Sequence, residues 1–155
     1  MERNEKDFGR LVNTYKSTIY TVCYMFSKNE DEVNDLFQET LVNLWKSMET
    51  FRQDSKMETW IYRVALNTCI THDRKKLRQK IPIEMSVSLY QDNDADTRQI
   101  QTLHQRIGKL GLIDRAIVLL WLENMSYEEI GQIMGISAQN VGVKLFRIKE
   151  LLKRG

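Results

Sequence analysis

The dipeptide His72-Asp73 is the part of this sequence that comes nearest to a metal-dependent hydrolase motif. Such a site needs further ligands, and His104 is the only other histidine in the chain. Cys23 and Cys69 lie far apart, without a CxxC pattern that could hold zinc, and we expect both to be buried reduced thiols. The sequence contains no nucleophile triad and no phosphate-binding loop. We therefore expect no enzymatic activity, no catalytic residue, no metal and no cofactor.

Residues 126–148, SYEEIGQIMGISAQNVGVKLFRI, carry side chains suited to recognition rather than to covalent chemistry. Ser126 and Glu129 match a capping box that starts a helix. Gly135 can adopt the left-handed conformation that ends this helix, and Ser137 can cap the next one. The pattern therefore predicts two short helices joined by a tight turn. Their inner faces would hold Ile130, Met134, Ile136, Val141, Leu145, Ile148 and Leu152.

The second helix of this hairpin keeps amide and cationic side chains on its outer face. They are Gln139, Asn140, Val143, Lys144 and Arg147. Such groups suit base edges and phosphates in the major groove of DNA. A hairpin used only for packing is the alternative, although packing does not call for a cationic outer face. Phe146 lies either near the DNA or against the preceding helix.

Apolar residues at steps of three and four predict helices through most of the chain, and no strand alternation is present. Helical spacing is lost from Leu77 to Thr97, which contains the only proline and the acidic run QDNDADT. We therefore predict an all-α fold of two small helical domains, residues 1–78 and 99–155, joined by a flexible linker, residues 79–98.

Charge alternates along the chain. The net charges of residues 1–50, 51–81, 82–98 and 99–155 are −3, +5, −3 and +3. Two basic surfaces of this kind suit two contacts on one polyanion, although solvated helix faces would give the same alternation. The longest apolar run, AIVLLWL, is too short to span a membrane, and no signal peptide is recognisable. We expect the protein to be cytoplasmic.

The N-terminal half resembles the second region of bacterial sigma factors of the extracytoplasmic-function (ECF) class. The pattern D-x-x-Q-E-x-x-x-x-x-W of that family is present as Asp35, Gln38, Glu39 and Trp45. It is followed by Thr59, Trp60, Ile61, Tyr62, Arg63, Val64, Ala65 and Asn67, and then by the basic tail Arg74, Lys75 and Lys76. The C-terminal hairpin follows in the family's order, so the resemblance covers nearly the whole chain.

This resemblance implies a sigma region 2 domain, which binds core RNA polymerase and the minus-ten promoter element, and a sigma region 4 helix-turn-helix domain, which recognises the minus-thirty-five element. In the family, the first helix pattern docks on a coiled coil of the polymerase's large subunit. The residues implied for core polymerase binding are Asp35, Leu36, Gln38, Glu39 and Trp45.

The resemblance also implies that the loop and helix from residue 52 onward capture unpaired bases of the minus-ten element. The residues implied here are Ser55, Lys56, Met57, Thr59, Trp60, Arg63, Asn67, Thr71, Arg74, Lys75 and Lys76. Aromatic stacking and edge hydrogen bonds offset the cost of opening the duplex. Trp60 is expected to belong to the core as much as to a base platform.

For the minus-thirty-five element, the resemblance implies Gln139, Asn140, Val143, Lys144, Phe146 and Arg147. Gly142 and Val143 depart from the T-V-[KR]-S-R-L pattern of many relatives, so a known promoter sequence cannot be transferred to this chain. A free-standing helix-turn-helix regulator is the alternative function, but it leaves the Trp45 and Thr59 to Asn67 patterns without a purpose. The expected partners are core RNA polymerase and promoter DNA; the resemblance leaves room for an anti-sigma factor, which the residues do not identify.

Overall fold

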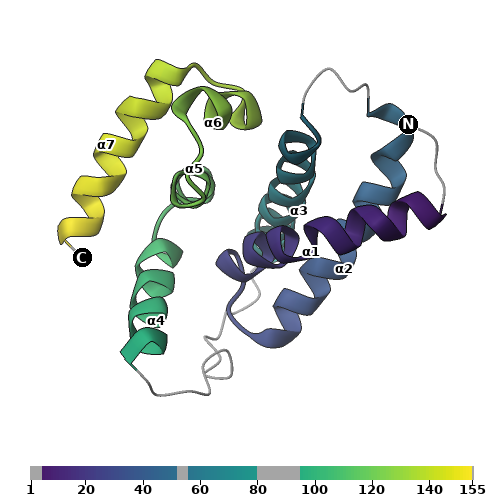
Figure 1. The fold of residues 1–155 in the computed structure, drawn as a ribbon. Coiled ribbons are helices and arrows are strands. Elements are labelled where there is room, and N and C mark those ends of the chain that lie inside the picture. Colours follow the sequence, from purple (N-terminus) through teal and green to yellow (C-terminus); the bar gives the residue numbers. More distant parts are fainter. Residues whose placement is uncertain (1–4, 52–55, 80–94, 155) are drawn as a thin grey trace. The chain divides into compact units, whose positions relative to one another are not determined.

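The computed structural model describes residues 5–51, 56–79 and 95–154. Within these ranges the chain is helical and has no strand. The elements are α1 (Glu5–Met25), α2 (Glu30–Ser47), the short 3-10 turn η1 (Met48–Thr50), α3 (Met57–Gln79), α4 (Ala95–Gly108), α5 (Leu112–Leu122), α6 (Tyr127–Met134) and α7 (Ala138–Arg154). They form two compact units, α1 to α3 and α4 to α7 (Figure 1). The predicted all-α fold of two helical domains is confirmed.

The predicted linker, residues 79–98, lies mostly in the segment 80–94, outside the described residues. Residue 79 belongs to α3, and residues 95–98 belong to α4. The bounds given above for the two domains and the linker stay a prediction.

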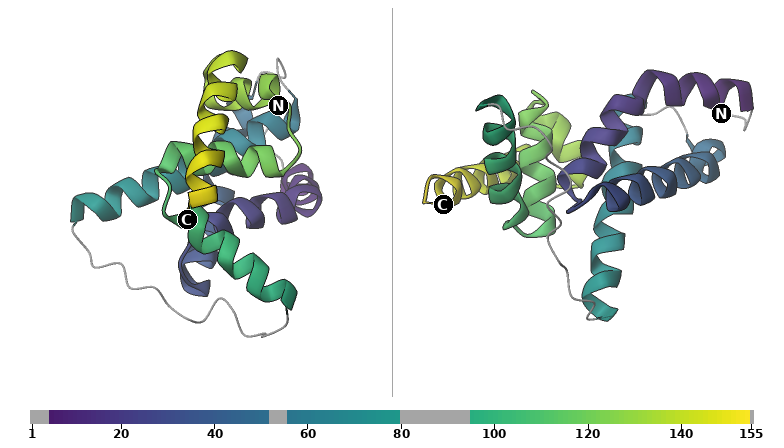
Figure 2. Two further views of the ribbon diagram at one scale, coloured as in Figure 1. Left: turned by 90° about the vertical axis from the view of Figure 1, so that its left-hand side faces the viewer. Right: turned by 90° about the horizontal axis from the view of Figure 1, so that it is seen from below.

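The first unit is a three-helix bundle in which each helix packs against the other two (Figures 1 and 2). Its core is apolar because each helix buries one stripe of residues at helical spacing. The apolar core side chains with 0 to 2% exposure are Ile19, Val22, Cys23, Phe26, Val33, Leu36, Leu44, Met48, Ile61, Ala65 and Cys69, and the hydroxyl side chains of Ser27 and Thr40 are buried to the same degree. The same stripe on α2 leaves the opposite face of that helix free for other contacts.

The start of α2 is set by a side-chain cap. Asn29 has extended backbone angles, and its Oδ1 accepts a hydrogen bond of 2.8 Å from the backbone N–H of Glu32. Three acidic residues in the first turn interact favourably with the helix dipole. A cap of this kind is worth about 1 kcal/mol. Asn29 therefore fixes the start of α2, and the acidic residues form its first turn.

The second unit is built around α5, which packs against α4 on one side and against α6 and α7 on the other. Helix α5 is the most apolar element of the unit, and five consecutive residues, Ala116 to Leu120, are buried. Helix α4 joins this core through Ile107, which is fully buried near its C-terminal end. The helical hairpin formed by α6 and α7 thus rests on an apolar support.

The turn between α6 and α7 has the predicted geometry. Ser126 and Glu129 form a capping box, in which the N–H of each donates to the side chain of the other, at 3.3 and 3.1 Å respectively. Gly135 is left-handed, with φ of 75°, and ends α6. The Ser137 hydroxyl accepts a 3.1 Å hydrogen bond from the N–H of Asn140 at the start of α7. These caps confirm the interpretation of the hairpin, including its tight turn.

Candidate nucleic-acid interfaces

Helix α7 has a buried face and an exposed face that match the predicted division. Val141, Leu145 and Ile148 are at most 1% exposed and attach the helix to its support. The remaining predicted recognition residues lie on the other side. Gln139, Asn140, Val143, Phe146 and Arg147 are exposed, and Lys144 is half-buried.

Phe146 is 70% exposed, which decides between the two alternatives for this residue. Its ring does not pack on the preceding helix, and Val143 beside it is 54% exposed. Singly exposed apolar groups are common on helix surfaces, but Val143 and Phe146 lie among amides and cations, and such groups suit contact with thymine methyl groups. The exposed face of α7 therefore combines apolar, amide and cationic groups.

The cations of α7 differ in how they are held. Lys149 lies over the ring of Trp121, with Nζ 4.4 Å from the ring centroid, so its charge is used in packing. Lys153 pairs with Glu150 at 3.8 Å, an exposed contact of little energetic weight. In the described part of the chain, Lys144 and Arg147 make no ion pair. These two residues are the cations most available to phosphate.

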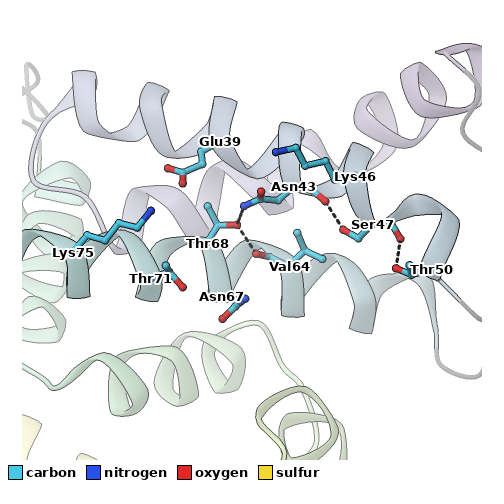
Figure 3. A pocket seen from close by; sticks show the side chains of 10 residues that line it. All are labelled: Glu39, Asn43, Lys46, Ser47, Thr50, Val64, Asn67, Thr68, Thr71 and Lys75. Carbon is cyan, nitrogen blue, oxygen red and sulfur yellow. Dashed lines mark hydrogen bonds between the residues drawn. The ribbon is translucent and has the colours of Figure 1, made fainter.

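A polar groove lies between α2 and α3 and encloses a volume of about 560 Å³ (Figure 3). We call it the α2–α3 groove. Its lining residues are Glu39, Asn43, Lys46, Ser47, Thr50, Val64, Asn67, Thr68, Thr71 and Lys75. It therefore brings together three residues implied for the minus-ten element, Asn67, Thr71 and Lys75, with side chains from α2.

Asn43, Ser47 and Thr68 were missed by the sequence reasoning. The Asn43 amide nitrogen donates to the Thr68 hydroxyl oxygen at 2.9 Å, which links the two helices across the groove (Figure 3). The Ser47 hydroxyl donates to the backbone carbonyl of Asn43. A polar i, i+4 pattern on α2 facing a polar pattern on α3 was the available signal, but it required knowing that these faces meet.

The other residues implied for the minus-ten element fall into three groups. Lys56, Arg63 and Arg74 are exposed, and Met57 is half-buried. Thr59 and Trp60 are only 6% and 8% exposed, so their side chains belong to the core. Ser55 lies outside the described residues, as does the side chain of Lys76. The role of Trp60 as a base platform does not agree with its burial.

The residues implied for polymerase docking do not share one surface. Asp35 and Gln38 are exposed on α2, and Val42, 49% exposed, lies on the same face one turn later. We call these three residues the outer face of α2. Leu36 is fully buried, so the expectation that it anchors a partner is wrong: its side chain fills the bundle core.

Trp45 and Glu39 point to other neighbours. The half-buried Trp45 ring makes an edge contact with Phe8 of α1, with centroids 5.2 Å apart. Glu39 lines the α2–α3 groove, and its Oε2 lies 3.8 Å from Nδ1 of His72 on α3. Glu39 thus faces α3 rather than the outer face of α2.

Two searches bear on other classes of site. Among the described residues, no group of three or more histidine, cysteine, aspartate or glutamate side chains could hold a metal ion. None of the helices within those same ranges is long and apolar enough to cross a membrane. In the part of the chain that the structure describes, His72 lies 3.8 Å from Glu39 and belongs to no such cluster.

Comparison with protein families gives matches for both units. Residues 11–79 match the family described as sigma-70 region 2, and residues 100–152 match the family described as sigma-70, region 4. The regions occur in the order expected from the sequence motifs. The chain belongs to the sigma-70 family.

Curated relatives narrow the class within that family. The ECF RNA polymerase sigma factor SigW of Bacillus subtilis is 28% identical over 171 residues, which cover 99% of this chain and 91% of the relative. The ECF RNA polymerase sigma-E factor of Haemophilus influenzae is 26% identical over 167 residues, covering 97% and 87%. These relatives place the chain among the ECF sigma factors.

Two solved structures share the fold. The sigma factor RpoE, crystallised with the anti-sigma factor NepR from Bartonella quintana, matches with a TM-score of 0.79 and 22% identity, over 96% of each chain. CnrH, in complex with the cytosolic domain of CnrY, matches with a TM-score of 0.72 and 23% identity, over 97% of this chain and 88% of that one. The helical fold is therefore shared along nearly the full length.

Proposed function

We propose that this chain binds core RNA polymerase and directs it to promoters by recognising a minus-thirty-five and a minus-ten element. It acts in the cytoplasm as an initiation factor with no catalytic residue of its own. The observation that carries the proposal is the exposed face of α7, where Val143, Phe146 and Arg147 lie opposite a fully buried stripe. A helix presented in this way fits the major groove.

The α2–α3 groove is assigned to the minus-ten element. An unpaired base that leaves the duplex needs a polar site for its edge, and the groove offers amide, hydroxyl and ammonium groups. Lys75 and Lys46 at its rim can bind the backbone phosphates on either side of such a base. The exposed Lys56, Arg63 and Arg74 extend this positive surface along α3.

The outer face of α2 is assigned to the polymerase. Asp35 and Gln38 supply polar contacts and the exposed Val42 supplies an apolar centre, a mixture that suits a protein interface. An anti-sigma factor is proposed as a further partner because two solved structures that share this fold are complexes, one with the anti-sigma factor NepR and one with the cytosolic domain of CnrY.

The test is reconstituted transcription. The purified chain is mixed with bacterial core polymerase and genomic DNA fragments, and the transcript start sites are sequenced. We expect transcripts from defined start sites that share two upstream motifs and that are absent with core polymerase alone. A free-standing helix-turn-helix regulator would bind DNA but would neither co-elute with core polymerase nor create new start sites, and that result would overturn the proposal.

A further inference from the structure

The orientation of the Asn43 carboxamide is determined by its neighbours in the α2–α3 groove. Thr68 has one hydroxyl hydrogen, and it is donated to the backbone carbonyl of Val64 at 2.8 Å. The Thr68 oxygen can therefore only accept a hydrogen bond from Asn43. The group that faces Thr68 at 2.9 Å must be the Asn43 amide nitrogen, Nδ2.

This arrangement leaves the Asn43 carbonyl oxygen, Oδ1, as the fixed hydrogen-bonding atom presented to the groove. Figure 3 draws this oxygen turned away from Thr68, on the side where Glu39 and Lys46 lie. Within the ranges that the structure describes, no group donates a hydrogen bond to it. Thr68 is only 4% exposed, so the hydrogen bonds that run from Asn43 to Thr68 and from Thr68 to the carbonyl of Val64 are shielded from water.

A fixed acceptor distinguishes between the bases at one point of the base edge, the exocyclic group on C4 of a pyrimidine or C6 of a purine. The N1–H and N2 amine of guanine and the N3–H of thymine are donors too, but they lie elsewhere on that edge, so the proposal places the C4 or C6 group at Asn43. Cytosine and adenine carry an amine, at N4 and N6, where thymine and guanine carry the carbonyl oxygens O4 and O6. An amine can donate to Oδ1 of Asn43, whereas a carbonyl there would put two acceptors together and leave both unpaired. A matched hydrogen-bonded pair is worth about 1 to 3 kcal/mol of discrimination against the wrong base.

The other polar side chains of the groove are not fixed acceptors of this kind. Asn67 and Thr71 carry acceptor oxygens as well, but both are exposed, and within the described ranges no hydrogen bond holds either side chain in one orientation. Lys46 and Lys75 are exposed, long cations that can turn toward phosphates. The Ser47 hydroxyl hydrogen is already donated within α2, to the carbonyl of Asn43. Glu39 is an acceptor too, but its carboxylate is drawn toward His72 at 3.8 Å.

We propose that Asn43 is a specificity-determining residue that selects cytosine or adenine at one unpaired position of the minus-ten element, and that Thr68 is the positioning residue that holds it. The inference rests on the proposed function, since it needs a base in the α2–α3 groove. It adds the chemical class of that base and a residue pair outside the family motifs.

The experiment uses the full chain with core polymerase and a promoter library in which each minus-ten position is randomised. Transcribed templates are sequenced, and the enrichment of each base is compared position by position. For the unaltered chain we expect one position at which cytosine or adenine exceeds thymine and guanine by about tenfold, the equivalent of about 1.4 kcal/mol.

Three variants separate recognition from stability. Asn43→Leu should reduce the enrichment at that position to less than about twofold and leave the minus-thirty-five preference intact. Thr68→Val keeps the packing volume but releases the carboxamide, so it should weaken the same preference. Thr68→Ser retains the hydroxyl that holds Asn43 and should keep the preference, and Thr21→Val on α1 is the matched control.

Failure of this inference can be told apart from failure of the proposed function. If the chain directs defined start sites but no minus-ten position prefers cytosine or adenine, the inference is wrong and the function stands. The same holds if Asn43→Leu and Thr68→Val both retain the preference. If no start sites appear even with the unaltered chain, the function fails, and the inference fails with it.

Discussion

Phe51 stacks on Trp60, with ring centroids 4.8 Å apart and an interplanar angle of 28°. Both rings are 8% exposed. The stack joins the residue after η1 to the first turn of α3, and so it ties together the two ends of the segment that contains Ser55. The Trp60 ring is therefore packed in the protein's own core, and the ring face on which a base would have to stack is not open.

The first prediction concerns this stack. Trp60→Ala should lower the free energy of unfolding by about 3 kcal/mol, because a large buried ring is lost and a cavity remains. Trp60→Phe should recover most of that loss by keeping an aromatic partner for Phe51. Urea denaturation followed by circular dichroism measures both. A Trp60→Ala variant as stable as the unaltered chain would contradict the structural role.

The second prediction concerns the turn between α6 and α7. A Cβ on Gly131 would lie 2.5 Å from the carbonyl oxygen of Ile136, a backbone atom that cannot move without opening the turn. Gly131→Ala should therefore destabilise the second unit by about 2 kcal/mol. Thermal unfolding monitored by circular dichroism checks this value.

Gly142→Ala is the matched control for Gly131→Ala. Its Cβ would meet only two ring carbons of Tyr127, at 3.3 and 3.6 Å, and alanine favours the helix over glycine by up to about 1 kcal/mol. We expect little change in stability, since the Tyr127 ring can shift. Equal destabilisation by the two substitutions would show that backbone crowding at Gly131 is not the cause.

The third prediction concerns the free cations of α7. Lys144→Ala or Arg147→Ala should weaken binding to minus-thirty-five DNA by about tenfold. Each should also reduce the slope of the logarithm of the binding constant against the logarithm of the salt concentration by about one, because one phosphate contact is lost. Association with core polymerase should be unchanged, because α2 is untouched. Lys149→Ala serves as the comparison, since its charge is already used on Trp121. Normal promoter binding by both variants in a gel-shift assay would remove α7 as the recognition helix.

The fourth prediction separates two acidic residues that the family motif groups together. Asp35→Arg should reduce co-elution with core polymerase by about tenfold, because it reverses a charge on the outer face of α2. Glu39→Gln should leave co-elution unchanged, since Glu39 faces α3 and His72. Titration of labelled chain with core polymerase measures both affinities. An equal loss for the two variants would place Glu39 at the polymerase interface.

The fifth prediction concerns the two thiols. Cys23 and Cys69 are fully buried, and Cys23 also lies 3.8 Å from the Thr40 hydroxyl oxygen. The hydrogen bond with Cys23 and burial together raise the pKa of the Cys69 thiol, so it stays neutral and unreactive near pH 8. The same hydrogen bond lowers the pKa of the Cys23 thiol, so the protection of Cys23 rests on its burial. We expect an aromatic disulfide reagent to label neither thiol in the native chain and both in urea. Rapid labelling of Cys69 without denaturant would contradict this expectation.

Local signals in the sequence were enough for the hairpin. The Ser126 and Glu129 capping box, the left-handed Gly135 and the Ser137 cap are interactions between residues at most four positions apart. Short-range geometry of this kind follows from residue type and spacing alone. The exposed face of α7 could be predicted for the same reason, because helical period decides which side chains point away from Val141 and Leu145.

The packing of α2 against α3 was decided only in the tertiary structure. Glu39 and Asn43 lie near the boundary between the buried and exposed faces of α2, so periodicity alone leaves their neighbours open. Packing of the three helices makes Leu36 and Trp60 core residues, directs Glu39 toward His72 and places Asn43 against Thr68, 25 positions along the chain. Contacts at that separation depend on how whole helices pack, and the α2–α3 groove is a product of that packing.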